Sequence, residues 1–131
     1  MAPSTAEVFL QAAPRANYIT INLSTRPGIA YGINNLGQAV GFYMLPGNGA
    51  FHGFLWKDGV LRDIGTLGGN YSEASAINDA GQVVGTSTLP GDAENHAFLW
   101  QNGVMRDLGT LGWSGALGEP ASVATSISSK G

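Results

Sequence analysis

Two histidines offer the first possible chemistry in this sequence. His52 and His96 stand 44 residues apart in the related strings HGFLW and HAFLW. An imidazole pair can bind a transition metal, and Asp92, Glu94 and Asn95 lie close enough in sequence to add ligands. A metal or catalytic site is normally single, however, whereas scaffold residues recur with a repeat. The recurrence favours a structural role, with each histidine hydrogen-bonded within its own unit. We therefore expect no catalytic residue, metal or cofactor.

An arginine–aspartate pair also recurs, as Arg62-Asp63 and Arg106-Asp107. Adjacent residues of a strand point to opposite faces, so each arginine should point away from its own aspartate and could reach an aspartate of a neighbouring unit. General acid–base chemistry would need a cleft that the sequence does not locate. We interpret Asp63 and Asp107 as structural residues, ion-paired or bonded to backbone, that brace the GTLG loop after them.

Three tryptophans could stack on sugar rings. Trp56 and Trp100 alternate with Phe54 and Phe98 along one face of a predicted strand, which favours a place in the core. Trp113 belongs to no predicted strand and stands among small residues, so it is the best candidate for a surface contact. The tentative binding residues are Trp113, His52, His96, Trp56 and Trp100.

Polar and glycine-rich turns suggest other chemistry only weakly. Asn34-Asn35 and Asn78-Asp79 resemble half of a calcium loop but lack its full ligand spacing and closing glutamate, so they are predicted to be turn residues. Gly65–Gly69 and Gly109–Gly112 precede neither a helix nor a lysine, which argues against a phosphate site.

These residues recur because the chain contains a repeat. Ile33–Gly68 aligns without a gap with Ile77–Gly112, and 21 of the 36 aligned positions are identical. A fixed period of this length indicates a repeat architecture.

Each unit is predicted to contain four short strands. In the second copy these are a strand ending at Ile77, then Gln82–Leu89, His96–Trp100 and Val104–Leu108. Turn glycines should separate them: Gly81 after the first strand and Gly103 between the last two, as Gly37 and Gly59 do in the first copy.

The strand faces indicate how the sheets pack. A period of two places His96, Phe98 and Trp100 on one side and Ala97 and Leu99 on the other, so both sides are largely apolar. An antiparallel sheet with one wet face would alternate apolar and polar residues. We therefore predict an all-β fold of repeated four-stranded antiparallel blades, a partial β-propeller, with a β-solenoid as the alternative.

The flanking segments extend this pattern. Tyr18–Leu23 is predicted to be the last strand of a preceding blade, and Ala6–Ala13 could form one or two helical turns. Ala121–Gly131 resembles another first strand and its turn. The expected organisation is a leader, extended or frayed (1–16), and a β-repeat domain (17–131), divided into the end of a blade (17–28), blade 1 (29–72), blade 2 (73–120) and the start of a further blade (121–131).

Composition excludes several classes of function. A net charge of −3 with six lysines and arginines gives no basic surface for nucleic acid or an anionic membrane. The absence of cysteine excludes disulfides and thiol chemistry. No apolar run is long enough to span a membrane, and no export signal is visible.

Taken together, the motifs resemble the HAF-type extracellular repeat of bacterial exported proteins. Gly81–Gly85, His96–Trp100 and Asp107–Gly112 carry the resemblance, which covers roughly residues 18–131. The first copy departs mildly from the pattern at Gly53 and Ile64. The resemblance implies a repetitive β fold and an extracellular or cell-surface location, and it implies no reaction.

The preferred function is a non-enzymatic module for structure, self-assembly or protein interaction. A carbohydrate-binding module is the alternative, and a propeller-type hydrolase or lyase rests on fold analogy alone. The expected partner is the chain itself or the rest of a longer chain, with a glycan as a further possibility. Two complete blades leave apolar faces open, so the chain is not expected to be a stable isolated monomer. A symmetric dimer or trimer, or an open assembly, would cover those faces.

Overall fold

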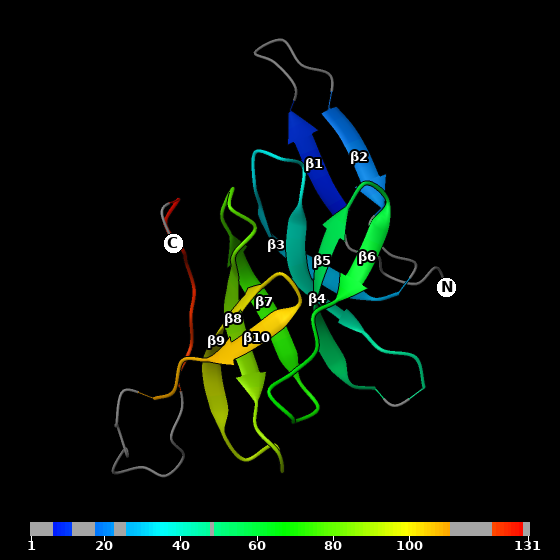
Figure 1. The fold of residues 1–131 in the computed structure, drawn as a ribbon. Helices are drawn as coiled ribbons and strands as arrows, with labels where there is room; N and C mark the ends of the chain where they lie inside the picture. Colours follow the sequence, from blue (N-terminus) through cyan, green and yellow to red (C-terminus); the bar gives the residue numbers. More distant parts are fainter. Residues whose placement is uncertain (1–6, 12–17, 23–25, 48, 111–121, 130–131) are drawn as a thin grey trace.

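The computed structural model describes residues 7–11, 18–22, 26–47, 49–110 and 122–129. These residues form ten strands and no helix, so the all-β prediction is confirmed (Figure 1). None of the described segments is a helix that could cross a membrane. The strands are β1 (Glu7–Gln11), β2 (Tyr18–Asn22), β3 (Gly28–Ile33), β4 (Ala39–Met44), β5 (Phe51–Lys57), β6 (Val60–Asp63), β7 (Ser72–Ile77), β8 (Val83–Thr88), β9 (Asn95–Gln101) and β10 (Val104–Asp107).

Eight of these strands form two antiparallel four-stranded sheets. Sheet 1 has the order β3-β4-β5-β6 and sheet 2 the order β7-β8-β9-β10, so each strand pairs with the next one along the chain. Their registers are offset by 44 residues: Gly28 pairs with Tyr43, and Ser72 pairs with Ser87. Both first strands also carry an irregularity at the equivalent position. Neither sheet is closed.

The predicted turns are present in both sheets. The hairpins between the last two strands place Asp58 and Asn102 at φ 50° and 52°, each followed by a glycine, Gly59 or Gly103, that also has positive φ. Two successive positive φ values match a type I′ turn, whose twist suits antiparallel strands. The turns after the first strands use Gly37 and Gly81 at φ 74° and 79°.

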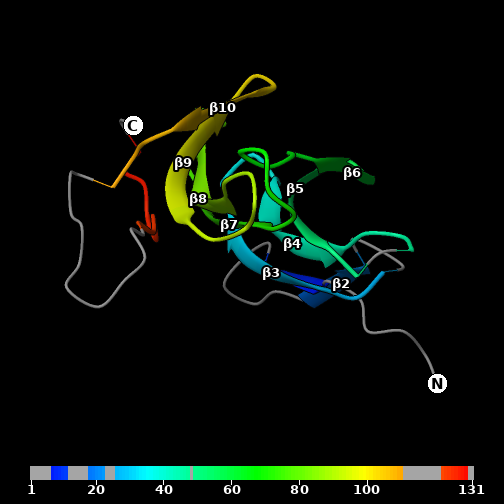
Figure 2. The same ribbon diagram turned by 90° about the horizontal axis from the view of Figure 1, so that it is seen from below.

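The two sheets stack face to face. We call the face of a sheet turned towards the following segment its C-face, and the opposite face its N-face. The C-face of sheet 1, which carries Val40, packs against the N-face of sheet 2, which carries Phe98 and Trp100. Figure 2 shows the sheets side by side from below. A second cluster, including Phe54 and Trp56, lies on the N-face of sheet 1. Apolar residues of both faces are therefore buried, as the strand pattern predicted.

The C-terminal segment 122–129 runs along the C-face side of sheet 2, drawn in red beyond β9 in Figures 1 and 2. The Ser122 hydroxyl accepts from the Ala97 amide at 2.7 Å, as the Ser72 hydroxyl accepts from the Gly53 amide at 2.8 Å. The segment is not a strand, although one was predicted there. β7 becomes a strand by pairing with β8, whereas no described strand pairs with 122–129.

The N-terminal predictions need two corrections. The sequence left one or two helical turns possible within Ala6–Ala13, but Glu7–Gln11 is β1 and pairs antiparallel with β2. The ladder provides this backbone with hydrogen-bond partners, and that tertiary gain overrides a weak local helix preference. Within the described residues, β2 pairs with β1 and is not the last strand of a four-stranded sheet. Leu23, at the end of the predicted strand, lies outside the described residues.

Candidate functional site

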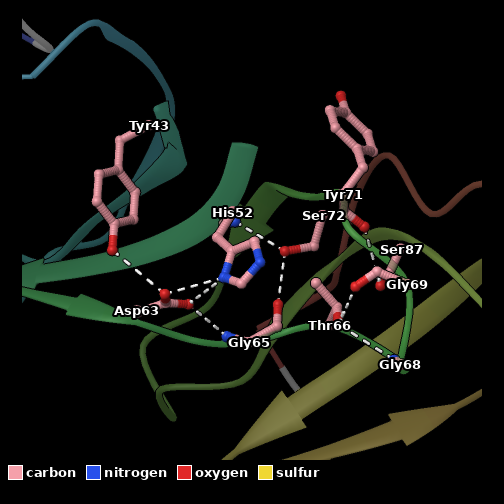
Figure 3. Close-up of polar contacts among 11 residues, drawn as sticks. Tyr43, His52, Asp63, Gly65, Thr66, Gly68, Gly69, Tyr71, Ser72 and Ser87 are labelled. Atoms are coloured by element: carbon pink, nitrogen blue, oxygen red, sulfur yellow. Dashed lines mark hydrogen bonds and ion pairs between the residues drawn. The ribbon is translucent and has the colours of Figure 1, made fainter. Parts of the chain in front are cut away.

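The recurring histidines each bind a carboxylate in their own sheet. His52 lies on β5 and Asp63 on β6, and the imidazole Nδ1 is 3.0 and 2.9 Å from the two carboxylate oxygens (Figure 3). His96 Nδ1 lies 2.8 and 2.9 Å from the oxygens of Asp107. These contacts confirm that each histidine hydrogen-bonds within its own unit.

The two aspartates also hold the loops that follow them. The Gly65 amide donates to Asp63 Oδ1, and the Gly109 amide donates to Asp107 Oδ1, both at 2.7 Å. The predicted bracing of the GTLG loops is therefore confirmed. Partial burial would raise the pKa of Asp107, but the hydrogen bonds from Gly109 and His96 and the attraction of the His96 ring outweigh it and lower that pKa.

Sheet 1 adds a tyrosine to its histidine–aspartate pair. The Tyr43 hydroxyl is 3.3 Å from Asp63 Oδ2, and the side chains of Tyr43 and His52 both point at the Asp63 carboxylate in Figure 3. Burial, followed by the nearby Asp63 charge, raises the pKa of Tyr43. The position equivalent to Tyr43 in sheet 2 is Ser87, so this third group does not recur.

Ser72 lies beside this cluster but is bonded to backbone. Its hydroxyl accepts from the Gly53 amide and donates to the Gly65 carbonyl at 2.6 Å (Figure 3). Ser122 makes the equivalent pair of contacts, with Ala97 and Gly109. These serines act as cross-links between a sheet and the segment that follows it. Neither serine was predicted to have this role, although Ser122 aligns with Ser72 once the six extra residues between the units are counted.

A second set of contacts joins the turns after the first strands. Asn35 donates to both carboxylate oxygens of Asp79, through its amide and its Nδ2, at 2.8 Å. These bonds, the side-chain one first, lower the pKa of Asp79. Asn34 Nδ2 donates to the Asn78 carbonyl, and Asn78 Nδ2 donates in turn to the Ser128 carbonyl. These residues form turns, as predicted, and link successive segments.

The possible metal ligands near His96 do not converge. Asp92 accepts hydrogen bonds from the Asn70 amide and the Thr88 hydroxyl, and these lower its pKa. Glu94 Oε2 is 3.8 Å from His96 Nε2, and the Asn95 carbonyl accepts from a backbone amide. Within the part of the chain that the structure describes, no group of three or more histidine, aspartate or glutamate side chains could hold a metal ion.

The predicted partner of Arg62 is wrong. Its guanidinium lies over the ring of Trp100 in sheet 2, 5.3 Å from the ring centroid, and not beside an aspartate. The residue opposite Arg62 in the stacked sheets presents an indole face, which attracts a planar cation. This pairing was not visible in sequence because it joins positions 38 residues apart across two units.

Arg62 and Trp100 border an open cleft between the two sheets, which we call the intersheet cleft. Its volume is about 280 Å³. Its lining residues are Leu36, Gln38, Leu55, Lys57, Arg62, Asp79, Ala80, Gly81, Trp100 and Asn102.

Two of the three tryptophans lie within the described residues. Trp56 and Trp100 are buried in the two core clusters, as their strand positions predicted. Neither presents a flat ring to solvent for sugar stacking. Trp113 lies outside the described residues.

No protein-family model, curated protein or solved structure matches this chain. The resemblance to HAF-type repeats therefore rests on the sequence motifs alone.

Proposed function

We propose that this protein is a non-enzymatic, extracellular β-repeat module that assembles by stacking sheets as a propeller stacks its blades. In this proposal the C-face of sheet 2 in one copy receives the N-face of sheet 1 in another, and the incoming β3 takes the place that residues 122–129 hold in the single chain. The contact would reproduce the packing of sheet 1 on sheet 2.

Differences in exposure between equivalent residues support the proposal most directly. Ile64 and Ile77 lie where the two sheets meet and are 6% and 8% exposed. Their equivalents at the outer ends of the stack, Leu108 and Ile33, are 47% and 45% exposed. Covering such side chains removes apolar surface from water, at roughly 25 cal/mol for each Å².

The polar cross-links indicate how the C-face of sheet 2 would hold a first strand, which is the contact that an incoming β3 would make. Ser122 and Ser128 contact sheet 2 as Ser72 and Asn78 contact sheet 1. A segment with little regular structure of its own thus occupies the place of a first strand. The extracellular location follows from the family resemblance, and the non-enzymatic role from the recurrence of the polar residues as scaffold contacts.

Light scattering after size exclusion, over a wide concentration range, tests the proposal. The unmodified chain should associate, whereas Ile33→Arg and Leu108→Arg should each prevent growth of the assembly by placing a charge in the contact. Val60→Arg is the matched control, because Val60 is exposed on the hairpin between β5 and β6. It should leave association unchanged.

Mixing the two variants identifies the geometry of the contact. Each variant keeps one intact end face, so an equimolar mixture of Ile33→Arg and Leu108→Arg should form a one-to-one dimer. A contact between identical faces would not give this result. A cooperatively unfolding monomer of 13.5 kDa at every concentration of the unmodified chain would refute the proposal.

A further inference from the structure

We infer that the intersheet cleft is a binding site for a small carboxylate ligand, of the size of a single acidic sugar. The inference depends on the cleft and not on association through the end faces, so the two can fail separately.

The cleft carries an excess of positive charge. Lys57 and Arg62 both line it, and among the described residues neither forms an ion pair with a carboxylate. Asp79 is the acidic residue of the cleft, and both of its oxygens accept hydrogen bonds from Asn35. Two cations and one anion leave an excess of positive charge, in a chain whose net charge is −3.

Trp100 holds the charged end of Arg62 at the cleft. The guanidinium carbon lies over the Trp100 ring, 5.3 Å from its centroid, where the electron-rich face of the indole attracts the cation. This attraction uses none of the N–H donors of the guanidinium. A carboxylate can accept two parallel hydrogen bonds from a guanidinium, which is the strongest arrangement for such a pair.

The size and polarity of the cleft suit a small polar ligand. The cleft volume of about 280 Å³ is near the lower limit for small-molecule sites, which suits one ring and not an extended chain. The side chains of Gln38 and Asn102 offer amide groups to hydroxyls. An acidic sugar combines both requirements, a carboxylate and several hydroxyls.

A second cleft provides an internal comparison. It has a volume of about 430 Å³, and Gln82, Leu99 and Arg106 line it at positions equivalent to Gln38, Leu55 and Arg62. Gln101 replaces Lys57 there, and no tryptophan of the described residues lines it. The arginine recurs, whereas the second cation and the aromatic support belong to the intersheet cleft.

Titration with glucuronate tests the inference, with the indole N–H signal of Trp100 followed by NMR and assigned with Trp100→Phe. Glucuronate should shift this signal saturably, whereas glucose, which lacks the carboxylate, should not. Inorganic phosphate should bind more weakly than glucuronate, because it lacks the sugar hydroxyls. Phosphate binding as tight as that of glucuronate would refute the acidic-sugar assignment, and absence of saturable glucuronate binding would refute the site.

Variants assign the residues. Arg62→Ala should weaken glucuronate binding at least about tenfold, whereas Arg106→Ala, the matched control, should leave it unchanged. Lys57→Gln, which recreates the second cleft, should weaken it by a smaller factor. Equal weakening by Arg62→Ala and Arg106→Ala would contradict the inference. If Arg62→Ala does not fold, as judged by circular dichroism, Arg62→Lys and Lys57→Gln decide the question: unchanged affinity in both would overturn it.

Discussion

The two four-stranded sheets share a strand order and a register, yet they differ where each meets its neighbour. Tyr43 on the N-face of sheet 1 is replaced by Ser87 in sheet 2, whose hydroxyl accepts from the Leu67 amide of the preceding unit. Phe42 on the C-face of sheet 1 is replaced by Thr86, whose Oγ1 is buried with no hydrogen-bond partner among the described residues. The two sheets therefore share strand order and register, whereas the side chains on each face differ according to the segment that packs against that face.

Gly53 and Ile64, where the first copy departs from the second, illustrate this rule. A Cβ at Gly53 would lie 2.9 Å from Ile64 Cδ1 and 3.2 Å from the Ala74 amide nitrogen. In sheet 2 the equivalent residues are Ala97 and Leu108, and Leu108 turns outward to solvent. Sheet 1 therefore combines glycine with isoleucine, and sheet 2 combines alanine with leucine, because the two residues of each pair must fit together.

The largest expected loss of stability tests a close approach between strands that both sheets share. A Cβ at Gly41 would lie 1.9 Å from the Ile29 carbonyl oxygen, and one at Gly85 would lie 2.0 Å from that of Glu73. Because backbone cannot yield cheaply, Gly41→Ala and Gly85→Ala should each cost about 3 kcal/mol or more of unfolding free energy. Urea unfolding measures this.

Gly81→Ala is the control for this pair. Its Cβ would meet nothing within 4 Å, and the cost, about 1 kcal/mol, should come from positive φ alone. An unchanged midpoint in Gly85→Ala would show that the close approach of the strands is not required.

The next effect distinguishes the two cross-linking serines. Ser72 is completely buried, so Ser72→Ala leaves the Gly53 amide and the Gly65 carbonyl without this partner and should cost about 2 kcal/mol. Ser122 is only partly buried, and Ser122→Ala should cost about half as much. Equal losses in urea unfolding would mean that residues 122–129 close sheet 2 as firmly as β7 closes sheet 1.

A double-mutant cycle sharpens the comparison of the coupled pair. Gly53→Ala alone should destabilise the protein by about 1 kcal/mol, because the new methyl group crowds Ile64. Adding Ile64→Leu recreates the pair found in sheet 2 and should recover more than half of that loss. Additive effects in the cycle would indicate that the two positions are independent.

The smallest effect concerns acid stability. The pKa of Asp107 is lowered in the folded state, so its contribution is present above the unfolded pKa of about 3.9 and is lost as the pH falls through the folded pKa. Because the side chain is largely exposed, the contribution should stay below about 1 kcal/mol. Asp107→Asn should flatten the stability curve between about pH 3 and pH 5.

Unfolding midpoints measured across that range, at low and high salt, check the last prediction. Added salt should shrink the difference between Asp107→Asn and the unmodified chain, since it screens exposed charges. If stability falls equally in both proteins as the pH is lowered, the assignment of this effect to Asp107 is contradicted.

Sequence patterns predicted the strands and turns well because their signals are local. Alternating apolar residues, the glycines at positive φ and the Asn102-Gly103 pair each act within a few residues. The His96–Asp107 contact was also accessible in outline, because it lies within one unit and recurs at 44 residues.

The failures share a different cause. Helical turns were considered possible around Glu7–Gln11 because local preference was considered without the partner strand β2. The aromatic partner of Arg62 and the roles of Ser72 and Ser122 depend on contacts between units. Such contacts follow from how the sheets stack, and no short stretch of sequence encodes that.

The cross-link at Ser72 has a consequence for the order in which the protein is synthesised. A chain that has emerged from the ribosome only as far as Tyr71 contains every strand of sheet 1 but lacks the hydroxyl that joins Gly53 to Gly65. The folded unit therefore extends past the last strand of sheet 1 and includes a residue of β7. Sheet 1 is completed by the first residue of the strand translated after it, so its folding is finished one step behind elongation.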